Sequence, residues 1–409
     1  MLRRTSLFAP LFLAVTLSSP AQQVDASNTG GPTPLDAPWR LHFGDDPAWA
    51  ASGFDDSNWT LHSIDKDWSI VGRKGYGGYA WYRTRVTLPR SSEPLAIAIY
   101  PPAQAVEVYT DGTLAGTIGR MRPEPVWTLL RDVYAVAVPA ALHGRSVEVA
   151  LRVWESPLQA VNPGAGSASH PPLMGTAADV ERIVSFEQQN RWVAAIPDWV
   201  VYLLGLAVGL FSLGLFLLQR HAREYAYAAG FLIGVAAEVL YTWNSMQTGA
   251  NARIFSQVDT GIRSFETCLW LLFTWGFVRA RADRLLYACL AASWTIFVGA
   301  GLLNLGIIHS AGLYWMIVPM NLFLSSAVFV RLYPLARRGN RDAQLFLVPS
   351  FLWIAMYLIM VTIWALYFSG IVDLTGAMIL YRDARFTITW VHLDWALLFI
   401  AIGAVMVLR

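Results

Sequence analysis

The side chains with the clearest potential for chemistry lie in one predicted strand near the N-terminus. The stretch GYGGYAWYRTRVTLP, residues 75–89, is a glycine-aromatic turn that runs into alternating side chains. In a strand, Trp81, Arg83 and Arg85 share one face, and an indole ring beside guanidinium groups could stack on a sugar or pair with a carboxylate. The alternative is that Trp81 packs beneath the glycine loop while the arginines are solvated. We expect a covered Trp81 ring, with Arg83 left at the rim as the better ligand contact.

Two acidic dipeptides precede this strand, in GDDPAW (44–49) and FDDSNW (54–59). Two carboxylates can serve as the acid and the base of a glycosidase. However, Asp in such a setting mainly provides turn and capping hydrogen bonds. We therefore expect turn residues here, with calcium or ligand contact as the lesser alternative.

No residue pattern predicts catalysis or a metal site. The seven histidines and two cysteines lack metal-ligand spacing, and the chain has neither HExxH nor GxSxG. We expect no catalytic residue, no metal and no cofactor, so the chain itself is not expected to be an enzyme. Any catalytic activity would lie in a cytoplasmic output domain beyond residue 409.

A second set of candidates interrupts the apolar C-terminal half. Charged groups inside a membrane are costly and are therefore functional candidates. Arg263 and Glu266 are three residues apart and can pair on one helix face. The set would suit a ligand-coupled helical bundle, although hydrogen bonding between helices is the simpler explanation. Its members are Glu238, Arg263, Glu266, Asn304, His392 and Asp394.

The candidates Trp81, Arg83 and Arg85 lie in the region of residues 38–188. The apolar and polar residues of this region alternate as in half-buried strands. In SVEVALRVW (146–154) the valines and Leu face one way while the polar residues face the other, whereas LAIAIY (95–100) is continuously apolar, as for a strand covered on both faces. Asp111-Gly112 supplies the turn of a hairpin, and DVERIVSF (179–186) is interpreted as a last short strand.

The predicted fold class is thus an all-β jelly-roll sandwich, extracytoplasmic, followed by an all-α seven-helix transmembrane bundle. We place a signal peptide at 1–21, because a basic start and a short apolar core precede small residues. A linker is expected at 22–37, and a stalk at 189–197 joins the sandwich to the bundle at 198–409.

The membrane half follows from composition, since 55% of the 409 residues are hydrophobic and only 14% are charged. No span shows the broken helices of a transporter or a filter repeat, and a net charge of +2 gives no reason to expect nucleic acid. Segments long enough to cross a bilayer are predicted at 198–219, 225–247, 260–280, 285–307, 312–333, 345–369 and 389–408.

Arginine placement predicts the orientation of these spans, because basic residues favour the cytoplasmic side. We expect a periplasmic N-terminal domain, a cytoplasmic C-terminus and a bacterial inner (cell) membrane location. The inward loops carry Arg220, Arg223, Arg279, Arg281, Arg284, Arg331, Arg337, Arg338 and Arg341, against Arg253, Arg382 and Arg385 in the outward loops.

Four ordered motifs carry a resemblance to a known family. They are FGDDPAWAASGFDDSNW (43–59), the strand at 75–89, EVYTDGTLAG (107–116) and ALRVW (150–154). Together they resemble the galactose-binding-like jelly roll at the N-terminus of family 2 glycoside hydrolases. In that family the module carries no catalytic acid or base, so the resemblance implies a fold and no catalytic role, and the candidate role of Trp81, Arg83 and Arg85 rests on their own chemistry.

Such a module before seven spans is similar to the bacterial seven-transmembrane receptors with diverse intracellular signalling modules. That resemblance implies a cytoplasmic output module of the histidine kinase, diguanylate cyclase or serine phosphatase type. The chain stops at AVMVLR, directly after the last predicted span. We expect a truncated record in preference to signalling through a separate partner.

We therefore expect a sensory receptor whose outer domain binds a small molecule, with carbohydrate as the first candidate, and whose bundle relays the signal. Such relay requires the ligand to bind two states with different affinity. The alternative is a membrane-anchored carbohydrate-binding or adhesion module without signalling, and a transporter comes third. A homodimer is an open possibility for the assembly.

Overall fold

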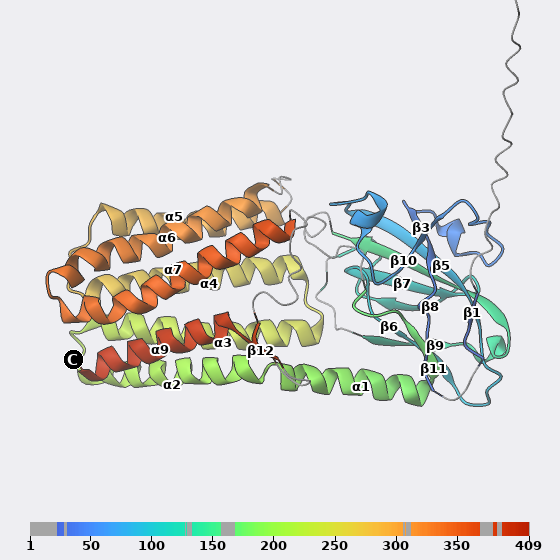
Figure 1. The fold of residues 1–409 in the computed structure, drawn as a ribbon, viewed down its shortest axis with the longest axis horizontal. Helices are drawn as coiled ribbons and strands as arrows, with labels where there is room; N and C mark the ends of the chain where they lie inside the picture. Colours follow the sequence, from blue (N-terminus) through green and yellow to red (C-terminus); the bar gives the residue numbers. More distant parts are fainter. Residues whose placement is uncertain are drawn as a thin grey trace, which may run out of the picture.

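A computed structural model of the chain describes residues 23–27, 31–126, 128, 133–156, 168–305, 307, 312–368, 379–382 and 387–408. Figure 1 shows a β-rich N-terminal part at one end of a helical C-terminal part. The signal peptide predicted at 1–21 lies outside the described residues.

Two sheets form the β part. The larger sheet has seven strands: β1 (Val24–Asp25), β3 (Trp39–Phe43), β4 (Thr60–His62), β5 (Gly78–Thr87), β7 (Ala105–Thr110), β8 (Thr113–Ile118) and β10 (Ser146–Glu155). Their order is β4-β3-β5-β10-β7-β8, with β1 parallel to β5. The smaller sheet has the order β2-β11-β6-β9, from β2 (Thr33–Pro34), β6 (Leu95–Ile99), β9 (Tyr134–Val138) and β11 (Leu173–Thr176).

Alternation along the strands builds the core between the sheets. Val147, Val149, Leu151 and Val153 of β10 are all buried in that core, as their period-2 spacing predicts. The predicted hairpin is confirmed, because Asp111 (φ 50°) and Gly112 (φ 83°) connect β7 to β8 in left-handed conformations. Both residue types accept such a turn at low cost.

All five residues of β6 are buried, which confirms the prediction from its continuous apolar sequence. One face of the strand meets the core, and helix α1 (Ala177–Ala194) packs on the smaller sheet, against β6, β9 and β11.

The strand predicted at 179–186 is wrong, because these residues belong to α1. The Thr176 hydroxyl accepts a hydrogen bond from the Asp179 backbone N–H (3.2 Å) and caps the helix. Val180 is fully buried and Val184 packs beside it. That spacing of four residues fits a helix face and not an alternating strand.

The expected linker at 22–37 also differs from the structure. Val24 pairs with Val86 of β5, β2 pairs with β11, and Leu35 is fully buried. The described parts of this segment therefore belong to the sandwich. The expected stalk is helical as well, since α1 ends at Ala194 and the next helix begins at Ile196.

Seven helices of the described residues form the helical part: α2 (Ile196–Leu218), α3 (Arg223–Thr248), α4 (Ala252–Phe277), α5 (Arg284–Asn304), α6 (Gly312–Arg337), α7 (Arg341–Phe368) and α9 (Trp390–Leu408). Each packs against its neighbour in this order, and α9 also packs against α2, which closes a ring. A hairpin of β12 (Ile379–Arg382) and β13 (Thr387–Thr389), which the sequence did not predict, lies between α7 and α9.

By length and composition, three of the helices searched could cross a membrane, namely α2, α3 and residues 284–302 of α5. A shorter apolar helix covers Val391–Val407. In Figure 1 the start of α2 and the connection between α3 and α4 lie at the end of the bundle that faces the sheets.

Candidate functional site

The candidate site lies on the outer face of the large sheet, meaning the face turned away from the small sheet. Because alternate residues of a strand point to opposite faces, the non-core positions of β5, β7 and β10 gather there. Strand pairing aligns Arg152 of β10 with Trp81 of β5 and Glu107 of β7. The face carries Tyr79, Trp81, Arg83, Arg85, Glu107, Tyr109, Glu148, Arg152 and Trp154.

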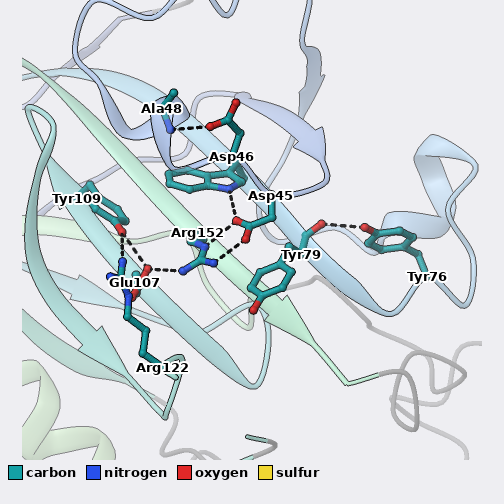
Figure 2. Close-up of polar contacts among 10 residues, drawn as sticks. Asp45, Asp46, Ala48, Tyr76, Tyr79, Glu107, Tyr109, Arg122 and Arg152 are labelled. Carbon is teal, nitrogen blue, oxygen red and sulfur yellow. Dashed lines mark hydrogen bonds and ion pairs between the residues drawn. The ribbon is translucent and has the colours of Figure 1, made fainter. Parts of the chain in front are cut away.

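Arg152 is the centre of an ion-pair network on this face (Figure 2). Its Nε and Nη2 donate to the two carboxylate oxygens of Asp45, at 2.7 and 2.6 Å. Its Nη1 donates to Glu107 Oε2 at 2.9 Å. The guanidinium thus makes a bidentate pair with one carboxylate and a single hydrogen bond to the other, an arrangement that suits its planar fork.

Aromatic and basic neighbours complete the network. The Tyr109 hydroxyl donates to Glu107 Oε2 (2.9 Å), and the Trp81 indole N–H donates to Asp45 (3.3 Å). The Arg122 Nε donates to Glu107 Oε1 at 2.9 Å. The Arg122 side chain is 65% exposed, so it carries the network to the solvent.

Electrostatics fixes the charge of both acids. Burial by itself raises the pKa of Asp45 and of Glu107, but the hydrogen bonds and positive charge of Arg152 outweigh it, so both pKa values lie below the ordinary range. Two ionised carboxylates therefore face Arg152 and Arg122. The network is balanced in charge and presents a cation outward.

Arg83 occupies a second network on the same face. Its Nε donates to Asp56 at 2.8 Å, and its Nη1 donates to the carbonyl oxygens of Ala51 (3.1 Å) and Trp49. The side chain is fully buried. The expectation that Arg83 stands at the rim is wrong, because the segment before β4 folds over it.

Trp81 is covered, as expected, but not by the glycine loop. Its ring stacks on Tyr109 (5.5 Å between centroids) and meets the edge of Trp49 (6.2 Å). These rings form a cluster with Trp59 and Phe54. The cover is therefore the segment that holds the two acidic dipeptides. Among the three predicted ligand contacts, only Arg85 is exposed (57%), and it lies 3.5 Å from Glu148.

The acidic dipeptides have divided roles. Asp46 and Asp55 accept hydrogen bonds from the backbone N–H groups of Ala48 (2.9 Å) and Ser57 (3.0 Å), as predicted for turn residues. Their neighbours Asp45 and Asp56 instead pair with Arg152 and Arg83 across the sheet. The sequence did not predict these pairs, because their partners are remote in the chain.

The connection between α3 and α4 docks beside the Arg152 network. Ala252, the first residue of α4, is only 1% exposed and packs with Ala105, Met121 and Trp154 of the β part. Trp154 lies two residues beyond Arg152 on the same face of β10. Asn251 also forms a β-bridge with Thr128. The outer face of the sheet is thus continuous with the helical part.

A cavity of about 330 Å³ adjoins this contact. Its volume is at the low end of the roughly 300–1,000 Å³ usual for small-molecule sites. The β part contributes Gly119, Arg120, Val126, Thr128 and Tyr134 to its lining, and the connection contributes Gly249 and Asn251.

Among the candidates of the helical part, Arg263 pairs with Glu238 (2.5 Å) and with Asp259 (3.0 Å). The predicted pairing of Arg263 with Glu266 is not seen. Asp259 was missed, although it precedes Arg263 by four residues, a spacing that could have indicated it.

His392 Nδ1 accepts a hydrogen bond from the Thr389 backbone N–H (2.9 Å), so Nε2 carries the proton that points to Asp198 (2.8 Å). Asp198 was also missed. The side chains of Asn304 and Asp394 lie outside the described residues. Within the described part of the chain, no group of His, Cys, Asp and Glu could hold a metal ion.

No family model and no curated protein matches the chain. Solved structures with partial similarity are glycoside hydrolases. A Bacteroides uniformis β-glucuronidase 2 is 19% identical over 35% of this chain and 17% of its own length, with a TM-score of 0.28. A family 2 hydrolase from Bacteroides cellulosilyticus is 17% identical over 31% and 18%, with a TM-score of 0.25.

A Ruminococcus gnavus β-glucuronidase is 14% identical over 30% of this chain and 21% of its own length, with a TM-score of 0.24. The chain thus spans about a fifth of each of these enzymes. They include members of the hydrolase family that the N-terminal motifs resemble, and no functional argument rests on so limited a likeness.

The geometry of the site suits binding. Asp45 and Glu107 are held ionised by a fixed guanidinium, so neither is a proton donor at neutral pH. The accessible groups are the guanidinium groups of Arg122 and Arg85 and the polar lining of the cavity. Such groups recognise the hydroxyl and carboxylate oxygens of a small solute.

Proposed function

We propose that this chain is the sensory part of a bacterial membrane receptor. The β part binds a small polar molecule, with carbohydrate as the first candidate, and the helical part relays binding to a cytoplasmic output module. The observation that carries the proposal is the docking of Ala252 against Trp154, next to the Arg152 network.

This contact supplies a physical route for the signal. A solute in the cavity would touch the β part through Arg120 and the α3–α4 connection through Asn251, so it would favour one relative position of the two. A ligand shifts an equilibrium only by its difference in affinity between the two states. A site that both parts line provides such a difference, and α1 gives a second, helical link to α2.

We further propose that α2 to α7 and α9 all cross the inner membrane, with the β part in the periplasm and the C-terminus in the cytoplasm. The excess of arginine in the loops at the end of the bundle remote from the sheets supports this orientation. The output module would be a histidine kinase, a diguanylate cyclase or a serine phosphatase.

The alternative is a carbohydrate-binding or adhesion module that the helices only anchor. An anchor does not require its helices to pack against the binding domain. The buried contact at Ala252 therefore favours the receptor.

A hydrogen-exchange experiment on the full chain in detergent distinguishes the receptor from the anchored module. The probes are D-galactose and D-glucuronate, a neutral and an acidic monosaccharide, each titrated while exchange is followed at residues 249–254 and along α3 and α4. For a receptor, a probe that binds should change protection in the connection and in both helices. Binding without any change in the helices would favour the anchored module.

The variant Ala252→Glu tests the route itself, because a carboxylate cannot be buried against Trp154 without a large cost. It should retain binding and lose the response of α3 and α4. Ala140→Glu, at an exposed position of the β part, is the matched control and should respond like the parent. An unchanged response in Ala252→Glu would contradict the proposed route.

A further inference from the structure

Three carboxyl groups and one guanidinium meet where α3 packs on α4. We name Glu238, Asp259, Arg263 and Glu266 the carboxyl cluster. Arg263 bridges Glu238 of α3 (2.5 Å) and Asp259 of its own helix (3.0 Å). The one cation of the cluster therefore pairs with two of its three acids.

Glu266 is the acid that Arg263 does not pair with. It is only 5% exposed, and its Oε1 has no hydrogen-bond partner among the described residues. A Cβ atom at Gly234 would lie 3.1 Å from that oxygen, so the absence of a side chain on α3 leaves room for the carboxyl group. The helix interface is shaped to hold this acid.

The Glu266 carboxyl group lies near Glu238, because its Oε1 packs against Gly234, one helical turn before Glu238 on α3. Two ionised carboxylates that lie close together in a buried helix interface repel each other, and neither has a donor to offer the other. One proton between them removes the repulsion and supplies the donor. The same physics governs pairs of carboxyl groups that share one proton in other proteins.

Among the described residues, the other charged and titratable groups that face the cluster offer no second cation. From α2, Tyr202 lies toward the cluster and Asp198 lies one helical turn before Tyr202, and from α9, His392 is hydrogen-bonded to Asp198. Arg263, with a side chain 63% exposed, is the member that reaches the surface.

From these contacts we infer that Glu238 and Glu266 form a proton-binding site that joins α3 to α4. The bound proton completes the bond between the helices, and its loss leaves two like charges at a buried interface. This site is independent of any sensed solute and goes beyond the proposed receptor function, because it makes the packing of the bundle depend on proton binding.

Infrared spectroscopy of the full chain in detergent at neutral pH tests the inference directly. A protonated carboxyl group has a C=O stretching band above the amide region that shifts in D2O. The parent should show such a band. In Glu266→Gln and in Glu238→Gln the intensity of the band should fall by the contribution of one carboxyl group. Glu181→Gln, at an exposed position of α1, is the control and should leave the band unchanged. Because Glu155 also contributes to the band at neutral pH, the test is its intensity, and an intensity equal to that of the parent in both cluster variants would overturn the inference.

Thermal unfolding provides a second readout. Glutamine keeps the shape of a protonated glutamate, so Glu266→Gln should melt within a few degrees of the parent. Once either acid is neutral the pair needs no proton, so the effects of Glu238→Gln and Glu266→Gln should be non-additive in the double variant. Strict additivity would contradict a shared proton.

Discussion

Arg152 shows how single residues shape the outer face of the sheet. Its guanidinium contacts two carboxylates that come from distant parts of the chain, Asp45 before β4 and Glu107 in β7. Removing one member of a buried ion pair costs more than the pair itself contributes, because the remaining charge is left without a partner. Arg152 therefore holds the covering segment against the sheet.

Replacing Arg152 with Met should destabilise the β part by about 3–5 kcal/mol. The pKa values of Asp45 and Glu107 are held low in the fold, so the stability from these acids is present above their ordinary pKa and is lost as the pH falls through the folded values. The variant should therefore show less acid sensitivity than the parent. Urea unfolding of a fragment of residues 22–194, followed over pH, measures both effects.

Arg145→Met is the matched control for this experiment. Arg145 is 3.7 Å from Asp111 in an exposed pair, and such pairs contribute at most about 1 kcal/mol. Equal losses for Arg152→Met and Arg145→Met would contradict a buried role for Arg152.

Trp81 is predicted to be a packing residue. Because its ring is buried against Tyr109 and Trp49, Trp81→Ala should lower the free energy of unfolding by about 3–5 kcal/mol. Trp192→Ala removes an exposed indole of α1 and should change the same fragment little. A melting temperature for Trp81→Ala within a degree or two of the parent would instead make the ring a binding surface.

Glu155, at the end of β10, should make stability depend on pH near neutrality. Burial, with a smaller contribution from Asp67, raises its pKa from 4.5 to about 7, against the hydrogen bond from Gln104. The folded state then holds the proton more tightly than the unfolded state, so stability is full below about pH 4.5 and falls as the pH rises through 7.

Glu155→Gln should remove this dependence and be the more stable protein at pH 8, by about 3 kcal/mol from a shift of about 2.5 pH units worth roughly 1.4 kcal/mol each. Unfolding titrations of the 22–194 fragment between pH 4 and 8 provide the measurement. Glu93→Gln, an exposed control, should retain the slope of the parent, and a parent without that slope would refute the role of Glu155.

At the scale of elements, the features that could be predicted from the sequence are those that local residue patterns determine. The alternation of β10, the buried run of β6 and the Asp111-Gly112 turn depend on residues close together in the chain. Most helices of the bundle lie within a few residues of the predicted spans, because apolar length alone marks them.

The failures are equally physical. The segment 179–186 of α1 is short and half apolar, so its helical face resembles the alternation of a strand, and only packing on the small sheet distinguishes the two. Arg83 has the alternation of an outward residue, and nothing near it in the sequence shows that the segment from Trp49 to Asp56 covers it. The Arg152 network and the docking of Ala252 require the tertiary fold and could not be predicted from spacing.

At the scale of the whole molecule, two connections join the β part to the helices. One is the nearly continuous helix of α1 and α2, and the other is the docked connection between α3 and α4. If the bundle spans the membrane as proposed, both connections lie on the periplasmic side, where a change in the β part could shift α2, α3 and α4 together.

Reporter fusions test this orientation. A reporter that is active only in the cytoplasm should be active when fused after Arg409 and inactive when fused after Asn190. The reason is the excess of arginine in the loops predicted to face inward. Activity of the Asn190 fusion would show that the orientation is the reverse of the one proposed. Inactivity of a stable Arg409 fusion would show that the number of spans is different.

The most direct test of the account is a disulfide between the β part and the α3–α4 connection. Thr128 and Asn251 are β-bridge partners, and paired strand residues have Cα atoms about 4.5–5.5 Å apart, within the range that a disulfide spans. The variant Thr128→Cys/Asn251→Cys should therefore crosslink on mild oxidation of the full chain, as detected by mass spectrometry of its peptides. The pair Thr113→Cys/Asn251→Cys, with one thiol on the exposed turn of β8, should not. Absence of the Thr128–Asn251 crosslink, with both thiols free to be labelled, would contradict the docking on which the proposed receptor function depends.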